Sequence, residues 1–273
     1  MNAVDERARG DDWLRLCEDA ARSLPGVQFD WARRLGSTQV DQVRRARQRA
    51  PDWPSVLAAW EQVSGKGRLG RTWLSQPGQA VTLSVALPWP AASAGGAVTL
   101  ACAVLVAETL RAEGIDAQIK WPNDILLGSK KLAGLLAEQV KDERGMGALV
   151  IGLGLNLQLP AQAMEATALA QARPMDGSVH EWADWNVRLA AALIQALEEV
   201  VQDGFAGFVS RFNALFAWRG QTVVVFDSQL GQVRCEGRAQ GIDAQGRLLV
   251  LVGQRCERVQ SGELSLRPAR QVA

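Results

Sequence analysis

The stretch AQIKWPNDILLGSKKLAGLLAEQV, Ala117 to Val140, decides the fold class. Its apolar residues lie in short runs on either side of Gly128 and Ser129, which indicates two strands joined by a tight turn. The Trp121–Pro122 step opposes a continuing helix, because the residue before a proline is disfavoured in the α region. We therefore expect a hairpin that places these polar residues around it: Lys120, Asn123, Asp124, Lys130 and Lys131.

The flanking sequence predicts an α+β protein. Helices are expected at 11–24, 38–50 and 95–114 and from about 180 to 218, the third one buried and ended by Gly114. Strands are expected at 55–63, at 148–159 and at 80–88, where alternation of apolar and small polar residues indicates a half-buried strand. Beyond Gly220, short strands between glycine-containing turns are typical of a small β-barrel or sandwich. We expect one domain over 1–218 and a second over 219–273.

Composition excludes several functional classes. Lys+Arg total 30 against 29 Asp+Glu, so no broad electrostatic field draws the chain to nucleic acid or anionic lipid. The single histidine, His180, lies in a polar context and argues against a Ser-His-Asp triad or a multi-histidine metal site. The four cysteines have no metal-ligand spacing, so reduced thiols in a cytosolic protein are expected, with a Cys235–Cys256 disulfide left open.

The N-terminal residues MNAVDERARGDDW are charged where a signal peptide needs an apolar core. The longest apolar run, around 101–107, is far shorter than the roughly 20 residues that span a bilayer. We expect no export and no membrane insertion, and hence a cytoplasmic protein.

A second stretch, SGKGRLGRTW from Ser64 to Trp73, combines three cations with three glycines. Glycines allow backbone N–H groups to converge on an anion, and Lys66, Arg68 and Arg71 add full positive charge. The spacing is not that of a P-loop, and GLGLN at 152–156 lacks the third glycine of a dinucleotide fingerprint. Taken alone, such a loop is more often a solvated basic turn, because charge-rich turns are common. The second cationic cluster, around Lys120, Lys130 and Lys131, favours the interpretation as a phosphate clamp.

Together these segments resemble the biotin protein ligases. SGKGRLGRTW is similar to the G-R-G-R-x-G-R-x-W loop of that family, KWPNDILLGSKKLAG to its K-W-P-N-D…K-L-A-G segment, and VIGLGLNL to its G-x-G-x-N strand. The resemblance runs from about residue 33 to 268. It implies a mixed-sheet catalytic domain of the class II aminoacyl-tRNA synthetase-like type, followed by a small SH3-like β-barrel.

The resemblance also implies an activity. Such enzymes join biotin to ATP, with Mg²⁺, giving biotinyl-5′-AMP and pyrophosphate. They then transfer biotin to one lysine of the biotin carboxyl carrier protein of acetyl-CoA carboxylase. Neither step needs a histidine, because catalysis is mainly positioning and electrostatic stabilisation by cations.

Carried over by motif, the resemblance implies three sets of site residues. The catalytic residues are Lys131 and Arg68. Biotin contacts are expected from Ser37, Thr38, Gln62, Gly65, Lys66, Arg68, Lys131, Gly134, Gly152 and Gly154. ATP and adenylate contacts are expected from Lys66, Arg68, Arg71, Trp73, Asn123 and Asn156, and Asp124 is expected to hold Mg²⁺ or a neighbouring cation. The residues alone leave plainer roles open, such as a helix cap for Ser37 and Thr38.

Three positions depart from the family pattern. Lys66 and Leu69 stand where arginine is common, and Gln39 stands where asparagine commonly follows the Ser-Thr pair. Lysine keeps the charge of arginine but loses its bidentate fork, so looser geometry is expected there.

Other functions stay open at this stage. A lipoate or octanoate ligase would share the fold, the arginine-rich segment 44–49 suits a nucleic-acid-binding module, and a non-catalytic interaction protein would turn over no nucleotide. Only 36 residues precede Ser37, fewer than a DNA-binding winged helix needs, so we expect a monofunctional ligase without operator binding, as a monomer or weak homodimer.

Overall fold

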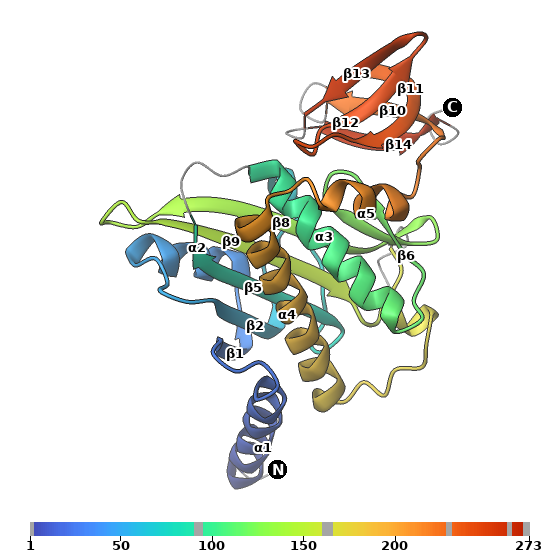
Figure 1. Cartoon of the computed structure of the whole chain (residues 1–273). Coiled ribbons are helices and arrows are strands. Elements are labelled where there is room, and N and C mark those ends of the chain that lie inside the picture. Colours follow the sequence, from blue (N-terminus) through green and yellow to red (C-terminus); the bar gives the residue numbers. More distant parts are fainter. Residues whose placement is uncertain (1–2, 90–94, 160–165, 228–230, 261–263, 270–273) are drawn as a thin grey trace. The chain divides into compact units, whose positions relative to one another are not determined.

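A computed structural model describes residues 3–89, 95–159, 166–227, 231–260 and 264–269 of the chain (Figure 1). Helices are separated by runs of consecutive strands, such as the four strands between 117 and 156 and the five strands after 222, and the predicted α+β class is confirmed. The chain forms two compact units. The first comprises Met1–Ser93 and Glu138–Ile194, and the second comprises Ala94–Ala137 and Gln195–Ala273.

The first unit is built on a mixed sheet. Its strands follow the order β1-β2-β5-β9, with β1 and β2 parallel and the other neighbours antiparallel. Helix α2 packs on β2, β5 and β9. The elements are α1 (Ala3–Ala21), β1 (Gln28–Leu35), α2 (Thr38–Gln48), β2 (Ser55–Gln62), β3 (Gly65–Lys66), a 3₁₀ turn (Arg68–Gly70), β4 (Thr72–Trp73), β5 (Ala80–Pro88), β9 (Gly147–Asn156), a 3₁₀ turn (Leu169–Gln171) and the first part of α4 (Val179–Asp203).

The second unit contains two sheets. One follows the order β8-β7-β6 and packs against α3, and the other is antiparallel in the order β13-β12-β11-β10-β14. Its elements are α3 (Gly95–Ala112), β6 (Ala117–Lys120), β7 (Asp124–Leu127), most of β8 (Lys130–Lys141), the end of α4, α5 (Phe208–Leu215), β10 (Thr222–Asp227), β11 (Gln232–Ile242), β12 (Leu248–Val252), β13 (Arg255–Val259) and β14 (Leu264–Pro268). The expected small C-terminal β domain is confirmed, while the boundary between residues 218 and 219 stays a prediction.

The segment Ala117–Val140 differs from its prediction. It forms three strands rather than two, because a turn with a cis Trp121–Pro122 bond separates β6 from β7. Trp121 at this turn is fully buried. The second turn lies where expected, with Gly128 in the left-handed region at φ 61° between β7 and β8.

Strand β5 is buried almost throughout, so the prediction of a half-buried strand was wrong. The small polar side chains, which suggested a solvent-exposed face, form hydrogen bonds with buried partners instead. Thr82 Oγ1 donates to Ala59 O at 2.7 Å, and Ser84 Oγ lies 3.0 Å from Thr38 Oγ1. A period-two pattern shows which residues of a strand are polar, but it does not show whether they face water. Hydrogen bonds inside the protein can satisfy polar side chains as well as water can.

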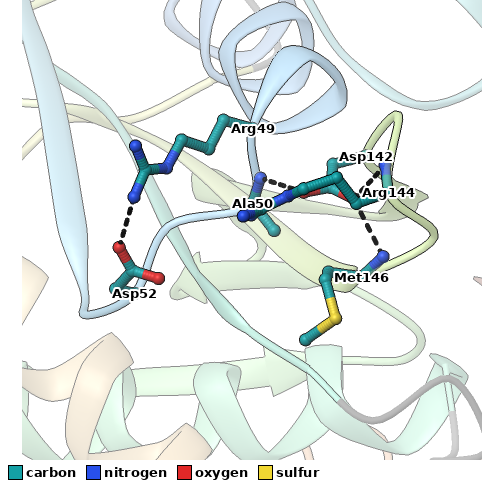
Figure 2. A network of polar contacts seen from close by, with 6 residues as sticks. All are labelled: Arg49, Ala50, Asp52, Asp142, Arg144 and Met146. Atoms are coloured by element: carbon teal, nitrogen blue, oxygen red, sulfur yellow. Dashed lines mark hydrogen bonds and ion pairs between the residues drawn. The ribbon is translucent and has the colours of Figure 1, made fainter.

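A buried carboxylate fixes the end of α2 to the turn between β8 and β9 (Figure 2). The oxygens of Asp142 accept hydrogen bonds from the backbone N–H groups of Ala50, Arg144 and Met146 and from the Arg144 guanidinium, at 2.8–3.1 Å. Burial raises the pKa of this carboxyl, but the hydrogen bonds from Ala50, Met146 and Arg144 outweigh burial and lower it to about 2. Asp142 thereby holds α2, whose first turn forms part of the site described below.

Two smaller expectations are resolved by the structure. All four cysteines are free, so the open possibility of a Cys235–Cys256 disulfide is not realised. Among the described residues, no helix is both long and apolar enough to cross a bilayer.

Candidate active site

A buried polar cluster lies at the first turn of α2, in the first unit. Ser37 occupies the N-cap position with extended backbone angles, but its side chain makes no capping bond. Ser37 is only 3% exposed, yet its Oγ has no hydrogen-bond partner among the described residues. A buried hydroxyl without a partner is costly, so the Ser37 side chain is well placed to bond a ligand.

The neighbours of Ser37 are already paired with one another. Gln62 Oε1 accepts from the Thr38 N–H at 2.7 Å and from Thr38 Oγ1 at 3.1 Å. These bonds fix the orientation of the Gln62 side-chain amide at the end of β2 and leave its Nε2 group as the donor. The predicted contact residues Ser37, Thr38 and Gln62 are therefore brought together by α2 and β2.

Gln39 adds a residue that the sequence singled out only as a departure from the pattern. Its Oε1 accepts from Ser84 Oγ at 3.1 Å, and its Nε2 donates to Glu138 Oε1 at 3.0 Å. The amide covers Gly152, where an added Cβ would lie 2.6 Å from Gln39 Oε1. Gly152 is thus required by close contact with Gln39, and a longer amide than asparagine fills the space above β9.

The basic loop is a tight hairpin formed by β3 and β4. The Gly67 N–H donates to Arg71 O at 2.8 Å, and the Arg71 N–H donates to Arg68 O at 3.2 Å. Leu69 and Gly70 both have positive φ, 57° and 71°. A left-handed leucine is strained by about 1 kcal/mol, because its Cβ crowds the following carbonyl. The two residues make a turn whose twist suits a two-stranded hairpin.

This hairpin presents its cations unevenly. Lys66 and Arg71 are exposed, whereas Arg68 is half-buried. Gly65 is confined, since a Cβ there would lie 2.7 Å from Trp73 O. Three positive charges within one short hairpin are an arrangement that an anion can neutralise.

The predicted adenine-side residues lie at β4 and at the end of β9. The Trp73 ring covers Gly154, where a Cβ would come within 2.5 Å of ring carbon Cε2. Asn156 is buried, and its Nδ2 donates to Thr167 O at 3.0 Å. Both side chains are fixed by the protein itself, Trp73 by packing and Asn156 by a hydrogen bond.

The second unit carries the other predicted cluster. Lys131 Nζ lies 2.6 Å from Asp124 Oδ1, and Lys120 Nζ lies 3.5 Å from Asp124 Oδ2. Gly134 faces this cluster, since a Cβ there would lie 2.9 Å from Lys131 Nζ. Asn123 supports the turn, because its side-chain Nδ2 donates to Leu135 O at 2.8 Å and its backbone carbonyl accepts from the Leu135 N–H at 3.0 Å.

The predicted site residues therefore form two groups, one on each compact unit. The first unit holds Ser37, Thr38, Gln62, Gly65, Lys66, Arg68, Arg71, Trp73, Gly152, Gly154 and Asn156, and the second holds Asn123, Asp124, Lys131 and Gly134. Sequence reasoning missed Gln39 and Ser84 as site residues. For Ser84 the available signal was a polar residue inside the apolar segment AVTLSVALP, whereas Gln39 lies in a polar helix and gave no such signal.

The arginine-rich segment 44–49 is mostly neutralised. Arg44 pairs with Asp41, Arg45 with Asp30 and Arg49 with Asp52. These ion pairs offset the positive charge of three arginines of the segment, while the fourth, Arg47, is exposed.

Comparison with known proteins decides the family. The model of the Biotin/lipoate A/B protein ligase family matches residues 31–156. The Biotin--[acetyl-CoA-carboxylase] ligase of Mycobacterium tuberculosis is 33% identical over 252 residues, which cover 87% of this chain and 88% of that protein. The chain belongs to this ligase family. The bifunctional ligase/repressor BirA of Escherichia coli is 34% identical to this ligase over 225 residues, covering 79% of this chain and 67% of that protein.

Solved structures agree with the fold. Biotin protein ligase from Aquifex aeolicus in complex with biotin and ATP aligns with a TM-score of 0.74 and 26% identity, covering 89% of this ligase and 99% of that chain. The expected resemblance to biotin protein ligases is thereby confirmed.

The described residues of this ligase offer few ligands for a metal ion. Within the described ranges, no group of three His, Cys, Asp or Glu side chains could hold a metal ion. Both oxygens of Asp124 face lysines. A Mg²⁺ ion that is bound mainly through nucleotide phosphates and water would need few protein ligands.

Proposed function

We propose that this ligase joins biotin to ATP to form biotinyl-5′-AMP and pyrophosphate, and then transfers the biotinyl group to a lysine of a biotin carboxyl carrier protein. The relative from Mycobacterium tuberculosis, a Biotin--[acetyl-CoA-carboxylase] ligase, and the Aquifex aeolicus complex with biotin and ATP support this reaction. The carrier is proposed to be that of acetyl-CoA carboxylase.

The polar cluster of Ser37, Thr38 and Gln62 is proposed to select biotin over lipoate or octanoate. Biotin has a ureido ring with two N–H donors and one carbonyl acceptor, whereas the dithiolane of lipoate and the chain of octanoate have none. The unpaired Ser37 hydroxyl and the donor amide of Gln62 offer partners for such a ring. A site built for hydrogen bonds discriminates strongly against a ligand that lacks them.

In the first chemical step, the biotin carboxylate attacks the α-phosphorus and pyrophosphate leaves. Lys131 is proposed to neutralise the carboxylate and the α-phosphate so that two anions can meet, and Arg68 and Lys66 to stabilise the charge that develops on the phosphoryl oxygens. Arg71 completes the positive charge of the hairpin. In the second step, the carrier amine attacks the activated carbonyl and AMP leaves.

Other residues hold the substrates. Trp73 and Asn156 are proposed to contact adenine and Asn123 to hold the nucleotide side. Gly65, Gly134, Gly152 and Gly154 are proposed to serve the site indirectly, because they let Trp73, Lys131 and Gln39 lie close against the backbone. Asp124 is proposed to act mainly on the neighbouring lysines, because both of its oxygens already face them. Mg²⁺, when bound, would screen the phosphate charge.

The remaining assignments are also proposals. The catalytic domain is placed at 1–218 and the small β domain at 219–273. The ligase is proposed to act in the cytoplasm, as a monomer or weak homodimer, and without binding DNA.

Transfer to a purified carrier domain tests the proposal. With biotin, ATP and Mg²⁺, mass spectrometry should find one biotinyl group on a single carrier lysine, and a carrier with that lysine changed to arginine should gain none. Modification with lipoate or octanoate but not with biotin would favour the alternative activity.

A further inference from the structure

The chain segment that leads into the C-terminal β domain lies on strand β6. The Ala217 N–H donates to Ile119 O at 3.0 Å, and Phe216 forms a parallel bridge with the fully buried Ile119. These backbone contacts place the next side chain, Trp218, beside Lys120. The Lys120 Nζ lies 5.7 Å from the centroid of the Trp218 ring, within the range of a cation–π interaction.

The Lys120 ammonium is held from two sides. Asp124 Oδ2 lies 3.5 Å away, and the side chain of Lys120 is only 26% exposed. The same carboxylate also binds Lys131 through Oδ1. Two ammonium groups thus share one carboxylate. The negative face of an indole offsets part of their mutual repulsion without neutralising either of them.

The backbone beneath Lys120 is fixed as well. Trp121 is fully buried, and its Nε1 donates to Gly246 O at 3.2 Å, in the turn between β11 and β12. Gly246 itself packs closely on α3, with Leu100 Cδ1 3.0 Å from an added Cβ. Because the main chain is held here, the freedom that remains belongs to the Lys120 side chain, and Trp218 restricts it.

We propose that Trp218 is a positioning residue for the adenylation reaction. Its indole seats the Lys120 ammonium on Asp124 Oδ2, which leaves Oδ1 to hold Lys131 at a fixed point. The effect passes from Trp218 through Lys120 and Asp124 to Lys131, and it gives the segment before the C-terminal β domain a part in the chemistry. This inference rests on the proposed function, in which Lys131 contacts the reacting groups.

A double-mutant cycle tests the proposal. Trp218→Leu should lower kcat for biotin-dependent pyrophosphate exchange about fivefold, the size expected for a partly buried cation–π contact, with KM for biotin unchanged. Trp218→Phe keeps an aromatic face and should restore most of the rate. In a Lys120→Met background, Trp218→Leu should have no further effect, because the residue through which it acts is gone.

Phe226→Leu is the matched control, since it removes another cation–π contact, with Arg267, inside the C-terminal sheet. Wild-type kcat in Trp218→Leu, an undiminished loss in the Lys120→Met background, or an equal loss in Phe226→Leu would each overturn the proposal.

A second readout does not need activity. Reductive methylation with formaldehyde, followed by mass spectrometry, should modify Lys120 faster in Trp218→Leu than in the wild type, while the exposed Lys130 reacts equally in both. Equal rates at Lys120 would show that the ring does not seat the ammonium. Absence of biotin-dependent exchange in the wild type would instead contradict the proposed function, and the methylation result would still decide the contact.

Discussion

Alanine substitutions at two glycines of β9, Gly152 and Gly154, should affect biotin binding and ATP binding differently. Neither Gly152 nor Gly154 has a positive φ, so alanine is tolerated by the backbone and acts only through its methyl group. At Gly152 the methyl group would lie 2.6 Å from Gln39 Oε1 and 3.3 Å from Ser84 Oγ. Gln39 cannot yield cheaply, because Ser84 and Glu138 both bind its amide.

Gly152→Ala should therefore push Gln39 and the neighbouring first turn of α2 out of place. Overpacking of a close-packed site costs about 1–3 kcal/mol. If half of that cost falls on the bound state, biotin affinity drops by about 2- to 12-fold, at 1.4 kcal/mol per factor of ten. Gly154→Ala would instead meet the Trp73 ring at 2.5 Å and should raise KM for ATP more than KM for biotin.

Calorimetric titration measures the affinity for biotin, steady-state kinetics measures KM for ATP, and thermal unfolding shows whether each variant is folded. Gly207→Ala is the control, because a Cβ at Gly207 would meet nothing within 4 Å. It should leave both affinities unchanged. A folded Gly152→Ala variant with wild-type biotin affinity would refute the placement of biotin beside α2 and β9.

Three further predictions concern the charged residues. Lys131→Ala should abolish adenylate formation, read by pyrophosphate exchange, with an unchanged circular dichroism spectrum; near-normal exchange would remove Lys131 from catalysis. Arg68→Gly should release the adenylate, which would then label bystander lysines detectable by mass spectrometry. In the wild type, biotin with ATP should protect the 66–71 loop from proteolysis. Equal cleavage with and without these ligands, together with no bystander labelling by the variant, would show that the loop is only a surface turn. Asp142→Asn should lower Tm at pH 7. The pKa of Asp142 lies below its unfolded value of about 4, so its stabilisation is complete above pH 4 and declines toward pH 2. The Tm difference from the wild type should shrink over that range, and a difference independent of pH would contradict the network in Figure 2.

Motifs and periodicity predicted the parts of the fold that depend on local chemistry. The helix Gly95–Ala112, the strands at 55–62 and 147–156 and the turn at Gly128 follow directly from apolar pattern and glycine. Strand β1 was not predicted, because QFDWARRL shows no alternation and the strand is defined by parallel pairing with β2. Such long-range pairing leaves no local signal.

The site was predictable to a similar extent. Ser37, Thr38 and Gln62 could be grouped only through resemblance, since their contact joins residues 24 positions apart. Gln39 was read as a variation on the pattern, yet it covers Gly152. The contact of Lys120 with Trp218 could not be foreseen, because Ala217 and Ile119 must first meet through their backbones.

Pyrophosphate exchange into ATP, with biotin, lipoate or octanoate offered singly to the purified chain, tests the central claim most directly. The exchange reports formation of the acyl adenylate itself and needs no carrier protein. The buried donors and acceptors around Ser37 predict rapid exchange with biotin and only background exchange with the other two acids. Exchange with lipoate or octanoate and none with biotin would contradict the account.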